Sequence, residues 1–196
     1  MTRDDNELFW AEMADVKPLA QSDRVFSNDP VTVTHAQLNR QAAAQANEYL
    51  DRLTLDAGLI KPVAPDDPLS FKRQGVQEQV FKNLRLGKYK HPTLLDLRAM
   101  KLRDARETLV RGLLAAFERE ERCVLLIHGK GAGNRPFPAL IKSAVNNWLP
   151  QLDEVMAFHS AIKEEGGNGA LYVMLAKSQT QKDAARETHH KGSGFR

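Results

Sequence analysis

The sequence predicts an α/β protein: a compact two-layer β-α-β-α-β-β domain with a small mixed sheet, plus a mostly helical or irregular N-terminal extension. Four short apolar runs have the length of strands, at residues 93–99, 123–129, 155–162 and 170–177. The segments between the first three are long and helical in pattern. Only the turn-forming KEEGGNG joins the last two strands.

These connections also predict strand directions. Two strands joined by a helical crossover are expected to be parallel, with a right-handed connection. The short turn before residue 170 instead favours an antiparallel pair between the last two strands. A sheet of mixed direction follows, with helices packed on it.

Residues 1–68 are expected to form the extension. An amphipathic helix is predicted over residues 6–19, ended by Pro18, and an Ala- and Gln-rich helix over 35–53. Turn-rich stretches follow each helix. Such a segment docks a partner or packs against its own domain, and the second role is favoured.

The next three segments complete the domain organisation. Residues 69–92 are predicted to be a basic helical lead-in, whose helix ends at Gly87. The domain itself spans 93–178, with one helix over 101–120 and another over 136–152. Residues 179–196 read as a polar tail.

Composition excludes some classes of protein. No apolar run approaches the roughly 18 residues of a membrane span, and residues 1–10 lack the apolar region of a signal peptide. The single cysteine, Cys123, excludes an internal disulfide and is expected to be a buried thiol. We therefore expect a cytoplasmic protein with no membrane partner, and the sequence leaves its oligomeric state open.

Charge is unevenly distributed along the chain. Residues 1–70 carry a net charge of −6 and residues 112–196 carry +2, whereas residues 71–111 hold 11 Lys and Arg against 4 Asp and Glu, or +7. A segment this basic suggests a phosphate-rich partner, with a solvated helix face as the alternative. The expected nucleic-acid-binding residues are Lys72, Arg73, Lys82, Arg85, Lys88, Lys90, Lys101, Arg103 and Arg106.

The most informative stretch is VLLIHGKGAG, residues 124–133, where an apolar strand ends at a histidine and three glycines. It lacks the Ser or Thr of a P-loop, and its glycines do not match the spacing of a dinucleotide fingerprint. Backbone amides around Gly129 and Gly131, with Lys130 as a point charge, suit a backbone phosphate. His128 is a candidate general acid or base, with a structural histidine as the alternative.

Three motifs in order carry a family resemblance: LDLR at 95–98, IHGKG at 127–131 and GGNGA at 166–170. Together they resemble the Smr (small MutS-related) domain, over roughly residues 69–178. The resemblance implies a fold like the C-terminal domain of translation initiation factor three. It also implies endonuclease activity on DNA or RNA.

One departure from the family pattern affects the expected chemistry. Arg98 replaces the histidine of the family's DLH motif, and Ala99 replaces the glycine that follows. Arginine binds phosphate but cannot accept a proton. In this departure the chain resembles the SmrA-type subgroup, to which DNA nicking is attributed.

The resemblance then assigns the site. Asp96, Arg98, His128 and Lys130 are the expected catalytic residues, with Asp96 orienting His128, binding a divalent cation, or only pairing with Arg98. Gly129, Gly131, Gly167 and Gly169 are expected to bind phosphate, or, in the last two, simply to make a turn. The sequence establishes no cofactor and leaves a divalent cation such as Mg²⁺ open.

Three functions remain open at this stage. The leading one is an endonuclease that nicks DNA with low sequence specificity. The second is a ribosome-associated endonuclease acting on RNA, which the extension would dock. The third is a nucleic-acid-binding module whose catalysis was weakened at Arg98. Binding to phosphates is expected to weaken steeply with salt.

Overall fold

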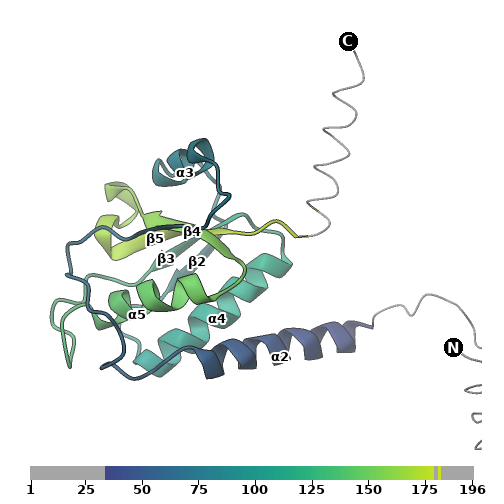
Figure 1. Ribbon diagram of the computed structural model, residues 1–196, viewed down its shortest axis with the longest axis horizontal. Helices are drawn as coiled ribbons and strands as arrows, with labels where there is room; N and C mark the ends of the chain where they lie inside the picture. Colours follow the sequence, from purple (N-terminus) through teal and green to yellow (C-terminus); the bar gives the residue numbers. More distant parts are fainter. Residues whose placement is uncertain (1–33, 179–180, 182–196) are drawn as a thin grey trace, which may run out of the picture. The chain divides into compact units, whose positions relative to one another are not determined.

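The computed structural model describes residues 34–178 and residue 181, and it contains a five-stranded mixed sheet (Figure 1). The strand order is β1-β4-β5-β3-β2. Strands β2 and β3 are parallel neighbours, and β5 runs antiparallel to both β3 and β4. The strands are β1 (Ser70–Lys72), β2 (Thr93–Asp96), β3 (Cys123–Ile127), β4 (Val155–Ser160) and β5 (Ala170–Leu175). The predicted α/β class, the mixed sheet and its two pair directions are confirmed.

Helices cover both faces of the sheet. Helices α4 (Leu102–Glu118) and α5 (Leu140–Trp148) share one hydrophobic core with β3, β4 and β5. Helix α3 (Glu78–Arg85) packs on the opposite face, against β4 and β5 (Figure 1). The prediction of two layers was therefore incomplete, because α3 forms a third.

The segment 70–90 differs most from its prediction. Its first residues form β1 instead of a helix, and β1 pairs antiparallel with β4 as the edge of the sheet. Only residues 78–85 are helical, and Gly87 follows with a φ of 64°. A three-residue strand has too few positions to show a period, so tertiary pairing decided its structure.

The two parallel strands end sooner than predicted. Strand β2 stops at Asp96 because the chain turns at Ala99, which has a left-handed φ of 59°. Strand β3 stops at Ile127, just before Gly129 with a φ of 71°. Arg98 and His128 consequently lie on the loops that leave these strands.

Helix α2 (His35–Arg52) belongs to the compact unit, which begins at His35. It packs against α4, and its Tyr49 is buried in the same hydrophobic core. Leu53 and Ile60 in the following segment are buried too. The expected packing of residues 35–53 against their own domain is thus confirmed.

Side chains from the domain hold the segment between α2 and β1. Arg106 donates to the carbonyl oxygens of Leu50 and Leu53, at 2.6 and 2.7 Å. The fully buried Lys142 donates to the carbonyls of Pro65 and Asp67. This segment is therefore held in place next to the ends of the strands.

The predicted helix at 6–19 and the tail at 179–196, except Gln181, lie outside the described residues. Within the described part of the chain, no helix is long and apolar enough to cross a membrane. Cys123 is buried as expected, and burial raises the pKa of its thiol to about 12.

Tyr49 offers a test of how far α2 contributes to stability. Its hydroxyl donates to Glu154 Oε2 at 2.8 Å and accepts from the amide of Asp153 at 3.1 Å. We expect Tyr49→Phe to lower the free energy of unfolding by about 1–3 kcal/mol, because it leaves buried polar groups without a partner. Urea denaturation measures the change.

Tyr89→Phe is the matched control. The hydroxyl of Tyr89 makes only a long contact of 3.4 Å to the carbonyl of Val80. Its removal is expected to change stability by less than about 0.5 kcal/mol. Equal effects of the two substitutions would show that α2 is not an energetic part of the domain.

Candidate active site

A cavity of about 460 Å³ opens where the parallel strands β2 and β3 end. The register pairs Asp96 with Ile127, so the residues that follow each strand emerge side by side. Open α/β sheets bind ligands at such strand ends. The cavity is lined by Arg98, Ala99, Met100, Lys101, Leu102, His128, Gly129, Gly131, Asn134, Arg135, Leu140 and Ile141.

His128 is the buried polar group of this cavity. Only 3% of its surface is exposed, and its Nδ1 lies 2.7 Å from the carbonyl oxygen of Gly129. Its Nε2 is buried and has no hydrogen-bond partner among the described residues. An unsatisfied buried nitrogen is costly, and such groups are typical of functional sites.

The contact to Gly129 defines the tautomer of His128. A carbonyl oxygen can only accept, so Nδ1 carries the proton and Nε2 carries a lone pair in the neutral ring. Burial lowers the pKa of His128 to about 4, so the ring is neutral at physiological pH. The site therefore presents a hydrogen-bond acceptor that matches a hydroxyl group.

Asp96 and Arg98 form an exposed, forked ion pair. Arg98 Nε donates to both carboxylate oxygens of Asp96, and its Nη2 lies 2.6 Å from Oδ2. The hydrogen bonds from Arg98 lower the pKa of Asp96, and Asp96 raises the pKa of Arg98. Of the three roles expected for Asp96, the structure contains the pair with Arg98.

This pairing bears on a divalent cation. Both oxygens of Asp96 already accept from Arg98. Elsewhere in the described part of the chain, no three His, Cys, Asp or Glu side chains gather as a metal site would require. Because Mg²⁺ is typically held by one or two carboxylates and several waters, its binding at Asp96 would require the pair with Arg98 to open.

Lys130 lies outside the cavity. Its Nζ is 2.6 Å from Asp66 Oδ1, on the segment between α2 and β1, and both side chains are exposed. The hydrogen bond from Lys130 lowers the pKa of Asp66. The expected contact of Lys130 with a phosphate in the cavity requires the pair with Asp66 to open.

The predicted glycines differ in what they do. The amides of His128 and Gly129 both donate to the carbonyl oxygen of Gly169, at 3.1 and 2.8 Å. The Gly129 amide is thus engaged within the protein, so it is not open to a phosphate. Gly167 and Gly169 form a 3-10 turn, η3 (Gly167–Gly169), that supports this loop and does not line the cavity.

Gly131 lines the cavity and requires glycine. Its φ is 58°, and a Cβ there would lie 2.6 Å from Asn134 Nδ2. Its carbonyl oxygen accepts from the amides of Asn134 and Ala139. Because Ala139 is held in this turn with a φ of 58°, α5 begins only at Leu140 and not at residue 136.

The nine basic residues predicted to bind nucleic acid divide into groups. Lys101 lines the active-site cavity, and Lys82 and Arg85 line a second cavity on the face covered by α3. Lys72 pairs with Glu78. Lys88, Lys90 and Arg103 are exposed.

Arg73 and Arg106 have structural roles instead. Arg73 donates to the carbonyls of Val155, Pro150 and Leu152, and Arg106 binds the end of α2. Both guanidinium groups are engaged with backbone oxygens. Their prediction as phosphate contacts is therefore not supported by the geometry.

The sequence analysis missed two polar residues of the cavity, Asn134 and Arg135. Arg135 is exposed and is the third cation of the lining, in addition to Arg98 and Lys101. The available signal was their position, directly after the glycines of the 129–133 loop. The turn that brings them back to the cavity depends on Gly131 and Ala139.

His128 predicts how stability depends on pH. Its pKa is about 4 in the folded protein and about 6.5 when unfolded. Between these values the unfolded chain binds a proton that the folded chain does not, so stability falls as pH is lowered. From pH 7 to pH 5 we expect the titration of His128 to lower the free energy of unfolding by about 2 kcal/mol.

Urea denaturation at both pH values measures this effect, with His128→Gln as the reference that cannot titrate. Between pH 7 and pH 5, the free energy of unfolding of the wild type should fall by about 2 kcal/mol more than that of the variant. The same loss in both proteins would contradict a buried neutral His128.

Three comparisons place the chain among known proteins. Residues 95–176 match the model of the Smr domain. The chain is 32% identical to the probable DNA endonuclease SmrA of Escherichia coli (strain K12), over 98% of this chain and 100% of that protein. It is 31% identical to the ribosome rescue factor SmrB of Shewanella sp. (strain MR-4), over 89% and 95%.

A solved structure is similar as well. The crystal structure of YdaL, a stand-alone small MutS-related protein from Escherichia coli, matches with a TM-score of 0.59 and 32% identity. The match covers 67% of this chain and 99% of that chain.

Proposed function

The chain belongs to the Smr family, and from this premise we propose that it is an endonuclease that cleaves RNA through the 2′-hydroxyl of its substrate. Membership of a nuclease family supports cleavage of phosphodiester bonds. The choice of RNA rests on one observation, the buried and unpartnered lone pair on His128 Nε2.

A ribose hydroxyl supplies what this nitrogen lacks. With the 2′-hydroxyl hydrogen-bonded to Nε2, the imidazole accepts the proton as the oxygen attacks the adjacent phosphorus. The bond from phosphorus to the 5′ oxygen breaks, and that oxygen takes a proton from water. The hydroxide that remains takes the proton back from the His128 imidazolium, which restores the neutral ring. The products are a 2′,3′-cyclic phosphate and a 5′-hydroxyl, and no metal-bound nucleophile is needed.

Cations around the cavity suit the negative charge that develops on the phosphate. Arg98, Lys101 and Arg135 line the cavity, and Arg98 becomes free to bind phosphate when its exposed pair with Asp96 opens. Preorganised charges of this kind stabilise the transition state of phosphoryl transfer. Arg98 thus acts as a phosphate clamp in place of the family's histidine.

Nicking of DNA is the second candidate, supported by the similarity to SmrA of Escherichia coli, which is named a probable DNA endonuclease. DNA has no 2′-hydroxyl, so a water would have to donate to His128 Nε2. The similarity to the ribosome rescue factor SmrB supports RNA and a ribosome as partners. Either nucleic acid is consistent with the cytoplasmic location expected from the sequence.

The first test is cleavage by purified protein of a structured RNA and of supercoiled plasmid. We expect RNA to be cut, in EDTA as well as in magnesium, and His128→Ala to lower kcat/KM at least a hundredfold, in the range typical for loss of a general base. Gel electrophoresis of end-labelled RNA measures the rate.

Arg40→Ala is the control for this assay, because Arg40 is an exposed cation on α2 that does not line the cavity and is not among the residues predicted to bind nucleic acid. Plasmid nicking without RNA cleavage would favour the DNA alternative. Salt-dependent binding with no cleavage of either substrate would contradict an enzyme and favour a binding module weakened at Arg98.

The Lys130–Asp66 pair makes a further prediction. If a substrate phosphate competes with Asp66 for Lys130, then Asp66→Asn releases the lysine and lowers KM. Because exposed ion pairs contribute little, we expect a decrease of about fivefold at most. Initial rates over a range of RNA concentrations measure it.

Asp56→Asn is the matched control. Asp56 lies on the same segment between α2 and β1. Its substitution by asparagine removes the same charge and keeps a side-chain oxygen that accepts from the Gly58 amide. Its KM should stay near that of wild type. An equal decrease in both variants would show a general charge effect and no contact of Lys130 with substrate.

A further inference from the structure

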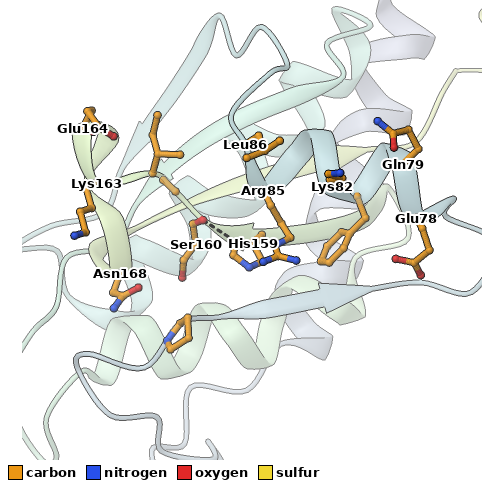
Figure 2. A pocket seen from close by; sticks show the side chains of 14 residues that line it. Glu78, Gln79, Lys82, Arg85, Leu86, His159, Ser160, Lys163, Glu164 and Asn168 are labelled. Carbon is orange, nitrogen blue, oxygen red and sulfur yellow. Dashed lines mark hydrogen bonds between the residues drawn. The ribbon is translucent and has the colours of Figure 1, made fainter.

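A second cavity, of about 750 Å³, lies on the face of the sheet that α3 covers (Figure 2). It opens between α3, the end of β4 and the turn η2 (Lys163–Glu165). Figure 2 shows Arg85 extending from α3 toward the end of β4, where His159 lies. The proposed cleavage uses none of these residues.

The walls of this cavity are partly flat and apolar. The rings of Phe81 and His159 meet edge to face, with centroids 5.9 Å apart and an angle of 75° between their planes. Leu86 also lines the cavity, and 51% of its surface is exposed. Aromatic and apolar surfaces of this kind are where unpaired nucleic-acid bases stack.

His159 adds a polar group with a defined direction. Its Nδ1 lies 2.8 Å from the carbonyl oxygen of Ser160, so Nδ1 is the donor and Nε2 carries the lone pair of the neutral ring. An acceptor beside an apolar wall suits the amino and imino groups on the edge of a base. The volume of the second cavity is sufficient for a ligand, because ligand sites typically occupy about 300–1,000 Å³.

Positive charge exceeds negative charge in the lining. Lys82, Arg85 and Lys163 face Glu78 and Glu164. Glu78 is already paired with Lys72, outside the cavity, which leaves Glu164 against three cations. A phosphate attached to the stacked base would therefore be attracted.

The second cavity is connected to the active site through one short turn. Asn168, which lines the second cavity, donates to the carbonyl oxygen of Asp66 at 2.6 Å. The side chain of Asp66 in turn holds Lys130. The neighbouring Gly169 accepts the amide of Gly129, on the loop that carries His128.

We propose that the second cavity binds an unpaired nucleotide of the same strand that is cleaved at His128, with its base against Phe81, His159 and Leu86. Its phosphate lies against Arg85 and Lys163. This inference rests on the proposed function and extends it, because a site for a splayed-out base selects single strands over duplexes. Lys130 and Asn168 lie along the route between the two cavities.

Binding of fluorescent 12-nucleotide single strands tests the proposal, using RNA and DNA of one sequence and the corresponding duplexes. Fluorescence anisotropy in EDTA gives Kd for wild type, Arg85→Ala and His159→Ala. We expect each variant to raise Kd for single strands about tenfold and to change Kd for duplexes less than twofold. Arg85→Ala should also lower the slope of log Kd against log salt by about one.

Arg40→Ala is the control, because Arg40 is an exposed cation on α2 that does not line the cavity and is not among the residues predicted to bind nucleic acid. The proposal requires its Kd for single strands to stay within twofold of wild type. Equal losses for Arg40→Ala and Arg85→Ala, equal losses for single strands and duplexes, or unchanged binding in both cavity variants would overturn it.

Comparing the RNA and DNA single strands shows which nucleic acid the cavity binds. Binding of either one that depends on Arg85 and His159 supports the proposal. Because binding is measured without turnover, its outcome is separate from that of the cleavage assay. If cleavage depends on His128 but Arg85→Ala and His159→Ala leave Kd unchanged, the proposed function stands and only this inference is contradicted.

Discussion

The site depends on one backbone contact, the pair of hydrogen bonds from the amides of His128 and Gly129 to the carbonyl oxygen of Gly169. These bonds extend the pairing of β3 with β5 past the end of β3. They hold the chain in the turn in which Gly129 has a left-handed φ and its carbonyl reaches His128 Nδ1. The tautomer of His128 follows from that turn, whereas burial lowers its pKa against the opposing effect of the contact with Gly129.

The same contact joins the two halves of the functional surface. Gly169 belongs to the turn that carries Asn168, and Asn168 holds the backbone of Asp66. The buried Lys142 fixes the carbonyls on either side of Asp66. One connected unit therefore lies at the end of the sheet where β2 and β3 finish. It consists of the loop with His128, the turn before β5 and the segment after α2.

The sequence predicted the parts of this arrangement that depend on period and motif. The strands, α4 and the position of His128 follow from apolar runs and glycine spacing. It did not predict β1, because three residues show no period. It also did not predict the roles of Arg73 and Arg106, because the sequence does not distinguish a basic side chain that binds phosphate from one that binds a backbone carbonyl. The pairing of Lys130 with Asp66 joins residues 64 positions apart, and no local pattern carries that information.

The central claim is that His128 Nε2 accepts the proton of a ribose hydroxyl. The chemical nature of the cut ends tests it most directly, by mass spectrometry of the fragments from a short RNA of defined sequence. The account predicts a 2′,3′-cyclic phosphate, or the 3′-phosphate formed when it opens, on one fragment and a 5′-hydroxyl on the other. A 3′-hydroxyl and a 5′-phosphate would show attack by water and contradict it.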